Sequence, residues 1–384
     1  MKKIICVNQV AGPLMIDMLN VLARNKCDVV LYTGEIAKTS TSLSEDVKVK
    51  KLIRYKKSNP MARVLTWLGF FLQVCILLFF ESNKNTKIYL TSNPPASPWL
   101  AIFLRGEVYV HIYDVFPNAL LALPWVSKTS FIYKVFLFLN QKAFGAARLI
   151  FTPSSAMRDM LLVSTQPEKV KVIPWWADTD FIKPINRSEN KFIKRHNLED
   201  KFVILYSGNF GLTHNIEKLL YSAEELQSRD DIVFVVIGGG PKSHVVNAFQ
   251  RTKGLKNLLV LPFQDEEMLP HSLTAADISV VLDSFSVGQN TDSTASIPSK
   301  TYYMMAAGSA IYGETDVSSE LSDLINGHKV GMCDDSQTID QFVNFVLTCR
   351  DDSGLLKFYK ANSRATSLRF TKENAKLLHG YLYG

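Results

Sequence analysis

Residues 297–308 read Ile-Pro-Ser-Lys-Thr-Tyr-Tyr-Met-Met-Ala-Ala-Gly. This order predicts a turn, then an apolar helix that stops at Gly308. Pro298 suits the first turn of a helix, because the N–H that it lacks would have no partner there. The free backbone N–H groups that begin at Ser299, together with the ammonium of Lys300, then form an anion site. A phosphate is the natural ligand of such a helix start.

The residues before this helix point to a parallel sheet. The run 278–282 is apolar and strand-like, and a polar loop that contains a glycine follows at 284–294. A strand, a polar loop and a helix N-terminus in this order describe a ligand crevice at the carboxyl edge of a parallel sheet. The predicted fold class is therefore α/β, with a ligand site at that edge.

Length and composition limit the class of protein. The chain has 384 residues, which favours two domains over a single core. Apolar residues make up 47% and charged residues 21%, the balance of a folded globular protein. The five cysteines are scattered and none forms C-x-x-C. This pattern indicates neither a disulfide framework nor a zinc site, and it fits a reducing cytosol, so the expected location is cytoplasmic.

Charge is divided unevenly along the chain. Residues 1–184 carry 23 Lys and Arg against 12 Asp and Glu, a balance of +11, whereas residues 185–384 carry 20 against 24, a balance of −4. A basic amino-terminal half suggests an anionic partner, and an anionic membrane surface is the expected one. A merely solubilising surface is the simpler alternative. Nucleic acid is not expected, because no recognition motif for it appears.

One long apolar segment lies in the basic half. Residues 61–80 are nearly all apolar, interrupted by Arg63 and Gln73, and twenty residues could span a bilayer. Three interpretations fit: a buried or half-buried helix of the amino-terminal domain, an interfacial helix lying on a membrane, and a transmembrane span. The basic run at 48–57 would bind anionic headgroups in the second case. The sequence favours the first interpretation and supports the span least.

Each half of the chain reads as its own β/α series. In the amino-terminal half, a strand at 3–7, a turn at Gly12, an amphipathic helix and a strand at 27–32 form a βαβ unit. This rhythm breaks at 178–198 and restarts at 202–206. The expected organisation is an amino-terminal domain at 1–180, a linker at 181–200, a carboxyl-terminal domain at 201–365, and a last helix at 366–384 that returns to the first domain.

Two glycine-rich turns follow strands of the carboxyl-terminal half. They are Gly-Asn-Phe-Gly at 208–211, after a strand at 202–206, and Gly-Gly-Gly at 238–240, after a strand at 232–237. Glycines at strand ends let backbone amides approach a phosphate. Neither turn has the glycine spacing of a P-loop or of a dinucleotide fingerprint. Each alone is more often a plain tight turn, but their joint placement at strand ends favours a ligand loop.

Metal-dependent and nucleophilic chemistries find no support. Residues 178–180 read Asp-Thr-Asp, a pattern that can hold a divalent metal, but they lie at the predicted linker. Capping or solvation is the expected role there, so no metal site is assigned. H-E-x-x-H, G-x-S-x-G and clustered His or Cys residues are all absent from the sequence.

Five motifs, in this order, resemble the family 4 retaining glycosyltransferases of the GT-B fold, in their bacterial capsule and O-antigen branch. They are Tyr-Asp-Val-Phe-Pro at 113–117, Ile-Pro-Trp-Trp-Ala-Asp at 173–178, Tyr-Ser-Gly-Asn-Phe-Gly at 206–211, Ala-Ala-Asp-Ile at 275–278 and Ile-Pro-Ser-Lys at 297–300. The resemblance spans the chain nearly end to end. It implies two Rossmann-like domains facing across a cleft, with the donor on the carboxyl-terminal domain and the acceptor on the other.

The resemblance also implies residue roles. Lys300 would offset the charge of the departing diphosphate, and Asp114 would face the acceptor, although a cap or turn is its alternative role. His111, three residues earlier, is expected to be a core histidine. The expected donor-binding residues are Gly208, Asn209, Gly211, His214, Gly239, Gly240, Phe263 and Ser299, and the expected acceptor-side residues are Gly12, Asn93 and Ser154. No cofactor is expected beyond the nucleotide-sugar substrate, and no metal.

The chain departs from the family pattern in two places. Many members carry an E-x7-E pair of glutamates ahead of the glycine at the helix end, where this chain has Ala295 and Tyr303. The usual Arg and Lys of the phosphate loop are also missing, and Asn209 and His214 stand roughly there. We therefore expect residues 299–300 to carry more of the diphosphate contacts.

Three functions remain open from the sequence. The first is an enzyme that transfers a hexose-type sugar, with retention, from a nucleotide-sugar to a lipid-diphosphate-linked glycan of a bacterial surface polysaccharide, at the inner face of the plasma membrane. The second is a nucleotide-sugar epimerase of the same fold, which would release nucleotide without any acceptor. The third is a non-catalytic module that binds a glycan or lipid. A rise in melting temperature on adding nucleotide would exclude this module, because ligands of the native state stabilise it.

Overall fold

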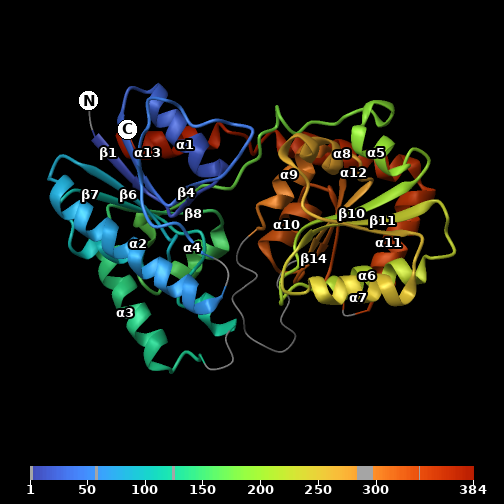
Figure 1. Ribbon diagram of the computed structural model, residues 1–384, viewed down its shortest axis with the longest axis horizontal. Helices are drawn as coiled ribbons and strands as arrows, with labels where there is room; N and C mark the ends of the chain where they lie inside the picture. Colours follow the sequence, from blue (N-terminus) through green and yellow to red (C-terminus); the bar gives the residue numbers. More distant parts are fainter. Residues whose placement is uncertain (1–2, 57–58, 123–125, 283–296, 337) are drawn as a thin grey trace. The chain divides into compact units, whose positions relative to one another are not determined.

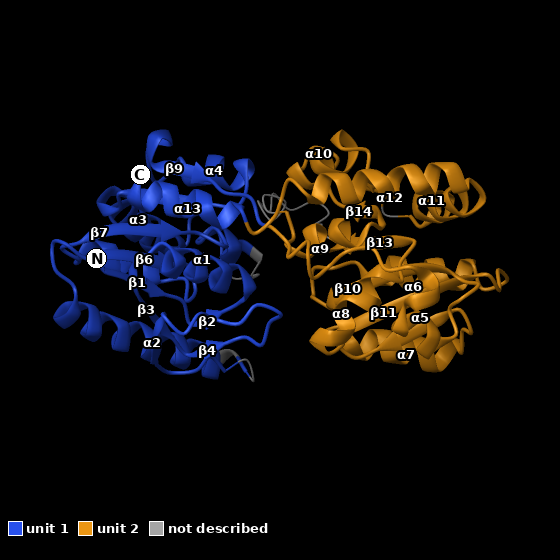
Figure 2. Cartoon of the chain, turned by 90° about the horizontal axis from the view of Figure 1, so that it is seen from above, with its two compact units in different colours: residues 1–175, 373–384 blue, residues 176–372 orange. Residues whose placement is uncertain are grey.

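The computed structural model describes residues 3–56, 59–122, 126–282, 297–336 and 338–384. The chain divides into two compact units (Figure 2): unit 1 comprises residues 1–175 and 373–384, and unit 2 comprises residues 176–372. Each unit is built on its own fully parallel sheet with helices packed against it (Figure 1). The predicted fold class, α/β with two Rossmann-like domains, is confirmed at the level of the units.

Unit 1 contains a seven-stranded sheet. Its central strands are rich in β-branched and aromatic residues and are buried on both faces, as parallel sheets covered by helices require. In spatial order the strands are β5 (Lys48–Lys51), β3 (Asp28–Thr33), β1 (Lys3–Val7), β6 (Lys87–Thr91), β7 (Glu107–His111), β8 (Leu149–Thr152) and β9 (Val170–Val172). Two short strands, β2 (Val10–Ala11) and β4 (Glu35–Ile36), form a separate pair.

The helices of unit 1 lie on both sides of its sheet (Figure 1). Helix α13 packs against α1, and its buried side chains are Ala375, Leu378 and Leu382. The helices are α1 (Pro13–Arg24), α2 (Pro60–Glu81), α3 (Phe131–Ala146), α4 (Ser155–Leu161) and α13 (Asn374–Tyr383), with 3-10 turns at Ser97–Ile102, Asn118–Ala122 and Pro167–Lys169.

Unit 2 contains a six-stranded sheet whose order reverses direction in the middle. In space the strands are β12 (Leu258–Leu261), β11 (Ile232–Gly239), β10 (Phe202–Asn209), β13 (Ile278–Leu282), β14 (Ala310–Glu314) and β15 (Gly331–Asp334). The chain starts at β10, adds two strands on one side, then returns to add three on the other. This is the 3-2-1-4-5-6 order of doubly wound nucleotide-binding folds, and its topological switch point lies between β10 and β13.

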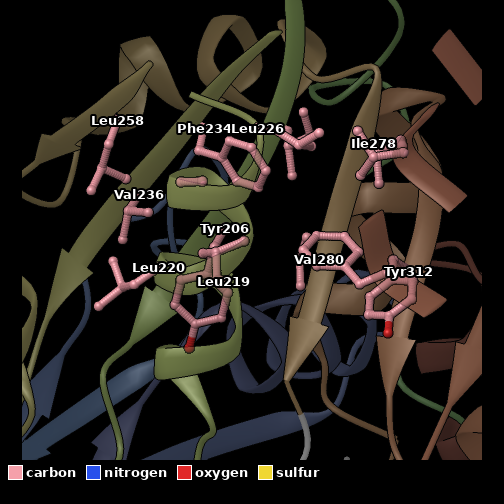
Figure 3. Packing of buried hydrophobic residues seen from close by; sticks show 14 of the residues in the cluster. Tyr206, Leu219, Leu220, Leu226, Phe234, Val236, Leu258, Ile278, Val280 and Tyr312 are labelled. Carbon is pink, nitrogen blue, oxygen red and sulfur yellow. The ribbon is translucent and has the colours of Figure 1, made fainter. Parts of the chain in front are cut away.

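Two helical layers cover this sheet (Figure 1). Side chains of α6, α7 and α11 enter one continuous core with strands β10 to β14, which Figure 3 shows from close by. Helices α5, α8, α9 and α12 contact one another in sequence on the other side. The helices are α5 (Lys191–His196), α6 (Ile216–Glu225), α7 (Ser243–Lys253), α8 (Leu269–Thr274), α9 (Lys300–Ala307), α10 (Glu320–Gly327), α11 (Asp340–Asp351) and α12 (Ser353–Ser367), with 3-10 turns at Arg187–Glu189 and Glu266–Met268.

The domain boundaries differ from those expected. The segment expected as a linker, 181–200, is part of unit 2 and folds into a 3-10 turn and helix α5. The side chain of Asn190 caps α5 and also donates to the carbonyl of His271, which ties this segment to α8. The return to unit 1 comes at residue 373, so α12 belongs to unit 2 and α13 alone returns.

The basic run of unit 1 is a strand and its continuation. Residues 48–51 form β5, the edge strand of the sheet, by pairing in parallel with Val30–Thr33 of β3. Three of its cations are in ion pairs: Lys48 with Asp28, Lys50 with Glu81, and Arg54 with Glu35. The run therefore neutralises neighbouring acids as well as adding positive charge to the surface.

A buried ion pair connects α6 to the edge of the second sheet. Lys218 Nζ lies 2.6 Å from Asp334 Oδ2 and both residues are 3% exposed. The hydroxyl of Tyr312 donates to the same carboxylate oxygen at 2.5 Å. Since the charges are removed from water together, each depends on its partner.

We expect Lys218→Met to lower the free energy of unfolding by about 3–5 kcal/mol, because it leaves the Asp334 carboxylate buried without its cation. Lys253→Met is the matched control, because Lys253 pairs with Glu224 at 2.5 Å but is half-exposed, and its loss should cost less than about 1 kcal/mol. Urea unfolding of both variants measures the difference. Equal losses would contradict the assignment of a buried, mutually dependent pair.

Candidate functional site

The switch point of unit 2 is where strands β10 and β13 separate. They pair only at Ile204 with Ile278 and Leu205 with Ser279, whereas β10 continues to pair with β11 as far as Asn209. Connections leaving two such strands turn to opposite faces of the sheet and leave a crevice at their carboxyl ends. The switch point is therefore the candidate position for a ligand in unit 2.

The two glycine-rich turns belong to strand ends rather than to loops. Gly208 pairs with Gly238, and Asn209 pairs with Gly239, as the last residues of β10 and β11. Gly238 has φ +151°, and a Cβ there would lie 1.9 Å from the carbonyl oxygen of Gly208. The strands were expected to end at 206 and 237. They run two to three residues further because glycine permits this close approach.

Helix α9 brings a cation to this edge. Lys300 is its first residue, and the Nζ atom lies 3.3 Å from the place where a Cβ on Gly208 would stand. The same ammonium lies 4.4 Å from the centre of the Tyr206 ring. Ser299 occupies the N-cap position and is exposed, with no side-chain cap bond, and the helix ends at Gly308 with φ +74°. The helix start and Lys300 therefore direct positive charge over the glycine backbone.

His214 completes this edge from the loop before α6. The Nδ1 atom lies 3.1 Å from the Tyr206 hydroxyl and 3.0 Å from the carbonyl oxygen of Asn209. Partial burial, and then the nearby Lys300, lower the pKa of His214 below its usual value. The imidazole is therefore neutral at physiological pH, and an anion bound beside it would favour its protonated form.

An exposed aromatic ring stands at the other end of the same edge. Phe263 is 61% exposed, and its ring lies 3.8 Å from where a Cβ on Gly239 would be. An exposed aromatic face beside a backbone of glycines offers a surface on which a planar ring can stack.

The structure brings together most of the residues expected on the donor side. Gly208, Asn209, Gly239, Gly240, Gly211, His214, Lys300 and Phe263 lie along the carboxyl ends of β10 and β11, and Ser299 adjoins Lys300. Two residues of this region were not expected as site residues, Tyr206 and Glu314. The polar loop expected at 284–294 lies outside the described residues.

Glu314 is a buried acid at the end of β14. It is 1% exposed, and its Oε1 atom accepts from Asn215 Nδ2 at 2.7 Å. Within the described part of the chain its Oε2 atom has no hydrogen-bond partner. Desolvation raises the pKa of this carboxyl to about 7, although Asn215 and Lys218 oppose the shift. Glu314 therefore supports the turn that carries His214, next to Asn215.

The residues expected on the acceptor side lie at strand and helix ends of unit 1. Asn93 Nδ2 donates to Asn8 Oδ1 at 3.1 Å, which connects the ends of β6 and β1 at the switch point of that sheet. Gly12 is the N-cap residue of α1, and Ser154 is buried and caps α4 through the N–H of Met157. Asp114 is exposed, three residues after the end of β7.

His111 is buried as expected but is not fully satisfied. Its Nδ1 atom lies 2.6 Å from the Tyr89 hydroxyl, whereas Nε2 has no partner among the residues that the structure covers. Burial lowers the pKa of His111 to about 3, so the ring is neutral.

The Asp-Thr-Asp segment serves as a cap. The carboxylate of Asp178 accepts from the N–H groups of Asp180 and Phe181 and pairs with Lys372 at 2.5 Å. In the described ranges no group of three or more His, Cys, Asp or Glu side chains is arranged to hold a metal ion.

Comparisons with known proteins agree with this geometry. Residues 187–287, which lie within unit 2, match the family described as Glycosyl transferases group 1. The chain is 24% identical over 303 residues to the "Probable glycosyltransferase WbjE" of Pseudomonas aeruginosa, covering 76% of this chain and 72% of that protein. These matches confirm the resemblance to the family 4 glycosyltransferases.

Solved structures share the fold along the whole chain. WaaG, a glycosyltransferase involved in lipopolysaccharide biosynthesis, superposes with a TM-score of 0.71 at 12% identity, over 99% of this chain and 100% of that one. Anabaena Alr3699/HepE in complex with UDP-glucose superposes with a TM-score of 0.71 at 14% identity, over 99% of each chain. The GT-B fold expected from the sequence is confirmed.

We expect Lys300→Ala to weaken binding of inorganic diphosphate at least about tenfold, because it removes a charge-assisted contact at the glycine edge. Titration calorimetry with sodium pyrophosphate measures this loss. Lys256→Ala, at an exposed lysine of the same unit, is the control and should bind as the parent does. Unchanged affinity of Lys300→Ala, with an unchanged melting temperature, would remove Lys300 from the site.

Glu314→Gln tests the buried acid. Because the pKa of Glu314 is about 7 in the folded chain against 4.5 for the free group, the folded state binds the proton more tightly. Its contribution to stability is full below about pH 4.5 and is lost as the pH rises through 7. The melting temperature of the variant minus that of the parent should therefore increase as the pH is raised from 5.5 to 8. A constant difference across that range would contradict a protonated Glu314.

Proposed function

We propose that this chain is a retaining, hexosyl-type glycosyltransferase of bacterial surface polysaccharide biosynthesis, of the O-antigen or capsule kind, because residues 187–287 match the family described as Glycosyl transferases group 1. It transfers a sugar from a nucleotide-sugar donor to a lipid-diphosphate-linked glycan. The observation that carries the proposal is the ammonium of Lys300 over the glycine backbone at the switch point of unit 2. Retention is proposed from the likeness to family 4 alone.

The chemistry of the donor supports the role of this edge. A sugar leaves a nucleotide as an oxocarbenium-like group, and negative charge develops on the departing diphosphate. Cations and N–H groups that already point to the diphosphate lower the activation barrier of the transfer, because they need no reorganisation during the reaction. Lys300, the start of α9 and the backbone at Gly208 meet this demand without a metal ion. HepE, which shares the fold, was solved with UDP-glucose, and this favours a nucleotide-sugar as the donor.

The acceptor is assigned to unit 1. Asp114 is exposed after β7 and can hold the attacking hydroxyl of the glycan, and Asn93 lies at the switch point of the same sheet. We propose Asp114 as the catalytic residue on the acceptor side, with Gly12, Asn93 and Ser154 shaping the surface that receives the glycan.

A helical surface of unit 1 supports a lipid-linked acceptor. Helix α2 buries one stripe of side chains, Phe70, Val74 and Leu78, in its unit. The opposite stripe stays exposed along the helix, each of its side chains between 51% and 78%: Met61, Leu65, Leu68, Leu72, Ile76 and Phe79. This is the only segment in the described part of the chain that is long and apolar enough to cross a membrane, and 22% of it is buried. A helix that packs on its unit along one stripe and exposes an apolar stripe on the other side favours an interfacial position.

Positive charge borders this stripe. The chain after β5 runs along α2, where the N–H of Ile53 donates to Gln73 and the ring of Tyr55 stacks on Trp67 at 5.9 Å. Lys51 and Lys56, on this segment, and Arg63, on the helix, are exposed. Each cation near an anionic membrane contributes roughly 1 kcal/mol to binding. We propose that the stripe binds the inner face of the plasma membrane, as a peripheral contact of a cytoplasmic enzyme.

We expect the triple variant Leu68→Ser, Leu72→Ser and Ile76→Ser to lose at least about tenfold in binding to phosphatidylglycerol vesicles, since it removes three exposed apolar side chains that the lipid would cover on binding. Vesicle sedimentation measures this binding. Val163→Ser, at another exposed apolar residue of unit 1, is the control. Equal binding by the triple variant and the parent would refute the proposed membrane contact.

The transfer itself is tested with a panel of nucleotide-sugars and a lipid-diphosphate-linked glycan. A thermal-shift screen with UDP, GDP, dTDP and CMP first identifies the nucleotide. We then expect acceptor-dependent release of this nucleotide and a product with the anomeric configuration of the donor, read by NMR. Lys300→Ala should lower kcat by about 100-fold or more. Release of nucleotide without acceptor, or an inverted product, would contradict the proposal.

A further inference from the structure

We propose that Tyr206 is the positioning residue of the anion site, holding both Lys300 and the turn at 208–214 in place for a diphosphate. This inference rests on the proposed function, because it assigns a diphosphate to that edge. It adds a residue that acts through its neighbours and touches no substrate itself, since Tyr206 is fully buried on β10.

The ring of Tyr206 is placed to hold the ammonium of Lys300. The Nζ atom lies 4.4 Å from the ring centroid, inside the roughly 6 Å range of cation–π attraction. Lys300 is half-buried, so the ring face shields its ammonium from part of the water that competes for the cation. Lys300 has a long, flexible stem, and a fixed ring face limits where the ammonium can stand.

The hydroxyl of Tyr206 organises the turn. It donates to the carbonyl oxygen of Asn209 at 2.7 Å, and this uses its single proton. Its oxygen can then accept only from a protonated Nδ1 of His214, at 3.1 Å. The His214 ring in turn packs 3.4 Å from where a Cβ on Gly211 would stand. One phenol therefore bonds both the Asn209 carbonyl and the Nδ1–H of His214, which that carbonyl also accepts, and so holds the two ends of the turn together.

The core of unit 2 would not by itself require this phenol. The ring lies in the same apolar cluster as Leu219, Phe234 and Val280, where phenylalanine would pack equally well (Figure 3). Figure 3 shows the hydroxyls of Tyr206 and Tyr312 pointing toward the same edge of the sheet. Tyr312 bonds the buried Asp334, whereas Tyr206 bonds the residues of the anion site. Tyr312 is thus a matched control for the loss of a buried hydroxyl.

A double-mutant cycle tests the coupling, with inorganic diphosphate as the probe in titration calorimetry. Tyr206→Leu should weaken binding about tenfold in the parent chain but only about threefold when Lys300→Ala is already present, because the contact between the ring and Lys300 is then gone and only the hold of the hydroxyl on the turn remains to be lost. Tyr206→Phe, which keeps the ring, should lose only about threefold, and Tyr312→Phe should lose nothing. Additive losses of Tyr206→Leu and Lys300→Ala would overturn the proposal.

A second series does not depend on the folding of Tyr206→Leu. Phenylalanines carrying one, two or five fluorine atoms at position 206 keep the packing and weaken the negative face of the ring. Affinity for diphosphate should fall stepwise with fluorine number, and a flat series would overturn the proposal. Because the probe is diphosphate alone, failure of the sugar transfer assay would refute the proposed function and leave this test intact.

Discussion

The approach of a lysine ammonium to a glycine backbone is the contact on which the functional edge of unit 2 depends. The Nζ atom of Lys300 lies 3.3 Å from where a Cβ on Gly208 would be, and the carbonyl oxygen of Gly208 lies only 1.9 Å from where a Cβ on Gly238 would be. A side chain at position 238 would therefore collide with the backbone of Gly208. The two strands can pair as far as Asn209 and Gly239 because residue 238 is a glycine, and a glycine at 208 leaves room for the ammonium of Lys300 above the strand end.

The strand order of unit 2 explains why the candidate site residues lie at one edge of its sheet. The reversal of strand order between β10 and β13 opens the sheet at one place, and the segments leaving it carry the cation and the imidazole. Buried groups one layer below hold these segments. Tyr206 fixes the turn from the strand side, and Glu314 fixes it through Asn215 from β14. The candidate site thus consists of short polar segments on a rigid apolar core.

Much of this arrangement could be predicted from the sequence, because it depends on local patterns. The apolar run at 202–206 identifies strand β10, although the strand runs on to Asn209, and the Pro-Ser-Lys start and Gly308 identify helix α9 and its end. The strand β5 was not recognised, since four residues with three lysines resemble a solvated charge run, and only pairing with β3 makes them a strand. The segment 181–200 was expected to be a linker because the helix that Asn190 caps packs on α8, about 80 residues later, and no local pattern reveals that contact.

The missed site residues share the same physical cause. In the sequence, Tyr206 is one more core residue of an apolar strand. Only the fold places His214 beside its hydroxyl and Lys300 over its ring. Glu314 lies 99 residues from the asparagine that it holds, so no spacing in the chain reveals the pair. Short-range periodicity predicts elements, whereas partners across a sheet follow from strand order and register.

The return of helix α13 to unit 1 has a consequence for biosynthesis. Unit 1 begins the chain, yet the side chains of α13 that cover α1 come after the whole of unit 2. A ribosome that builds the chain from its amino terminus releases a continuous unit 2 before it releases the piece that completes unit 1. The amino-terminal unit, with the apolar stripe of α2 on its surface, is therefore completed only after the whole of unit 2 has left the ribosome.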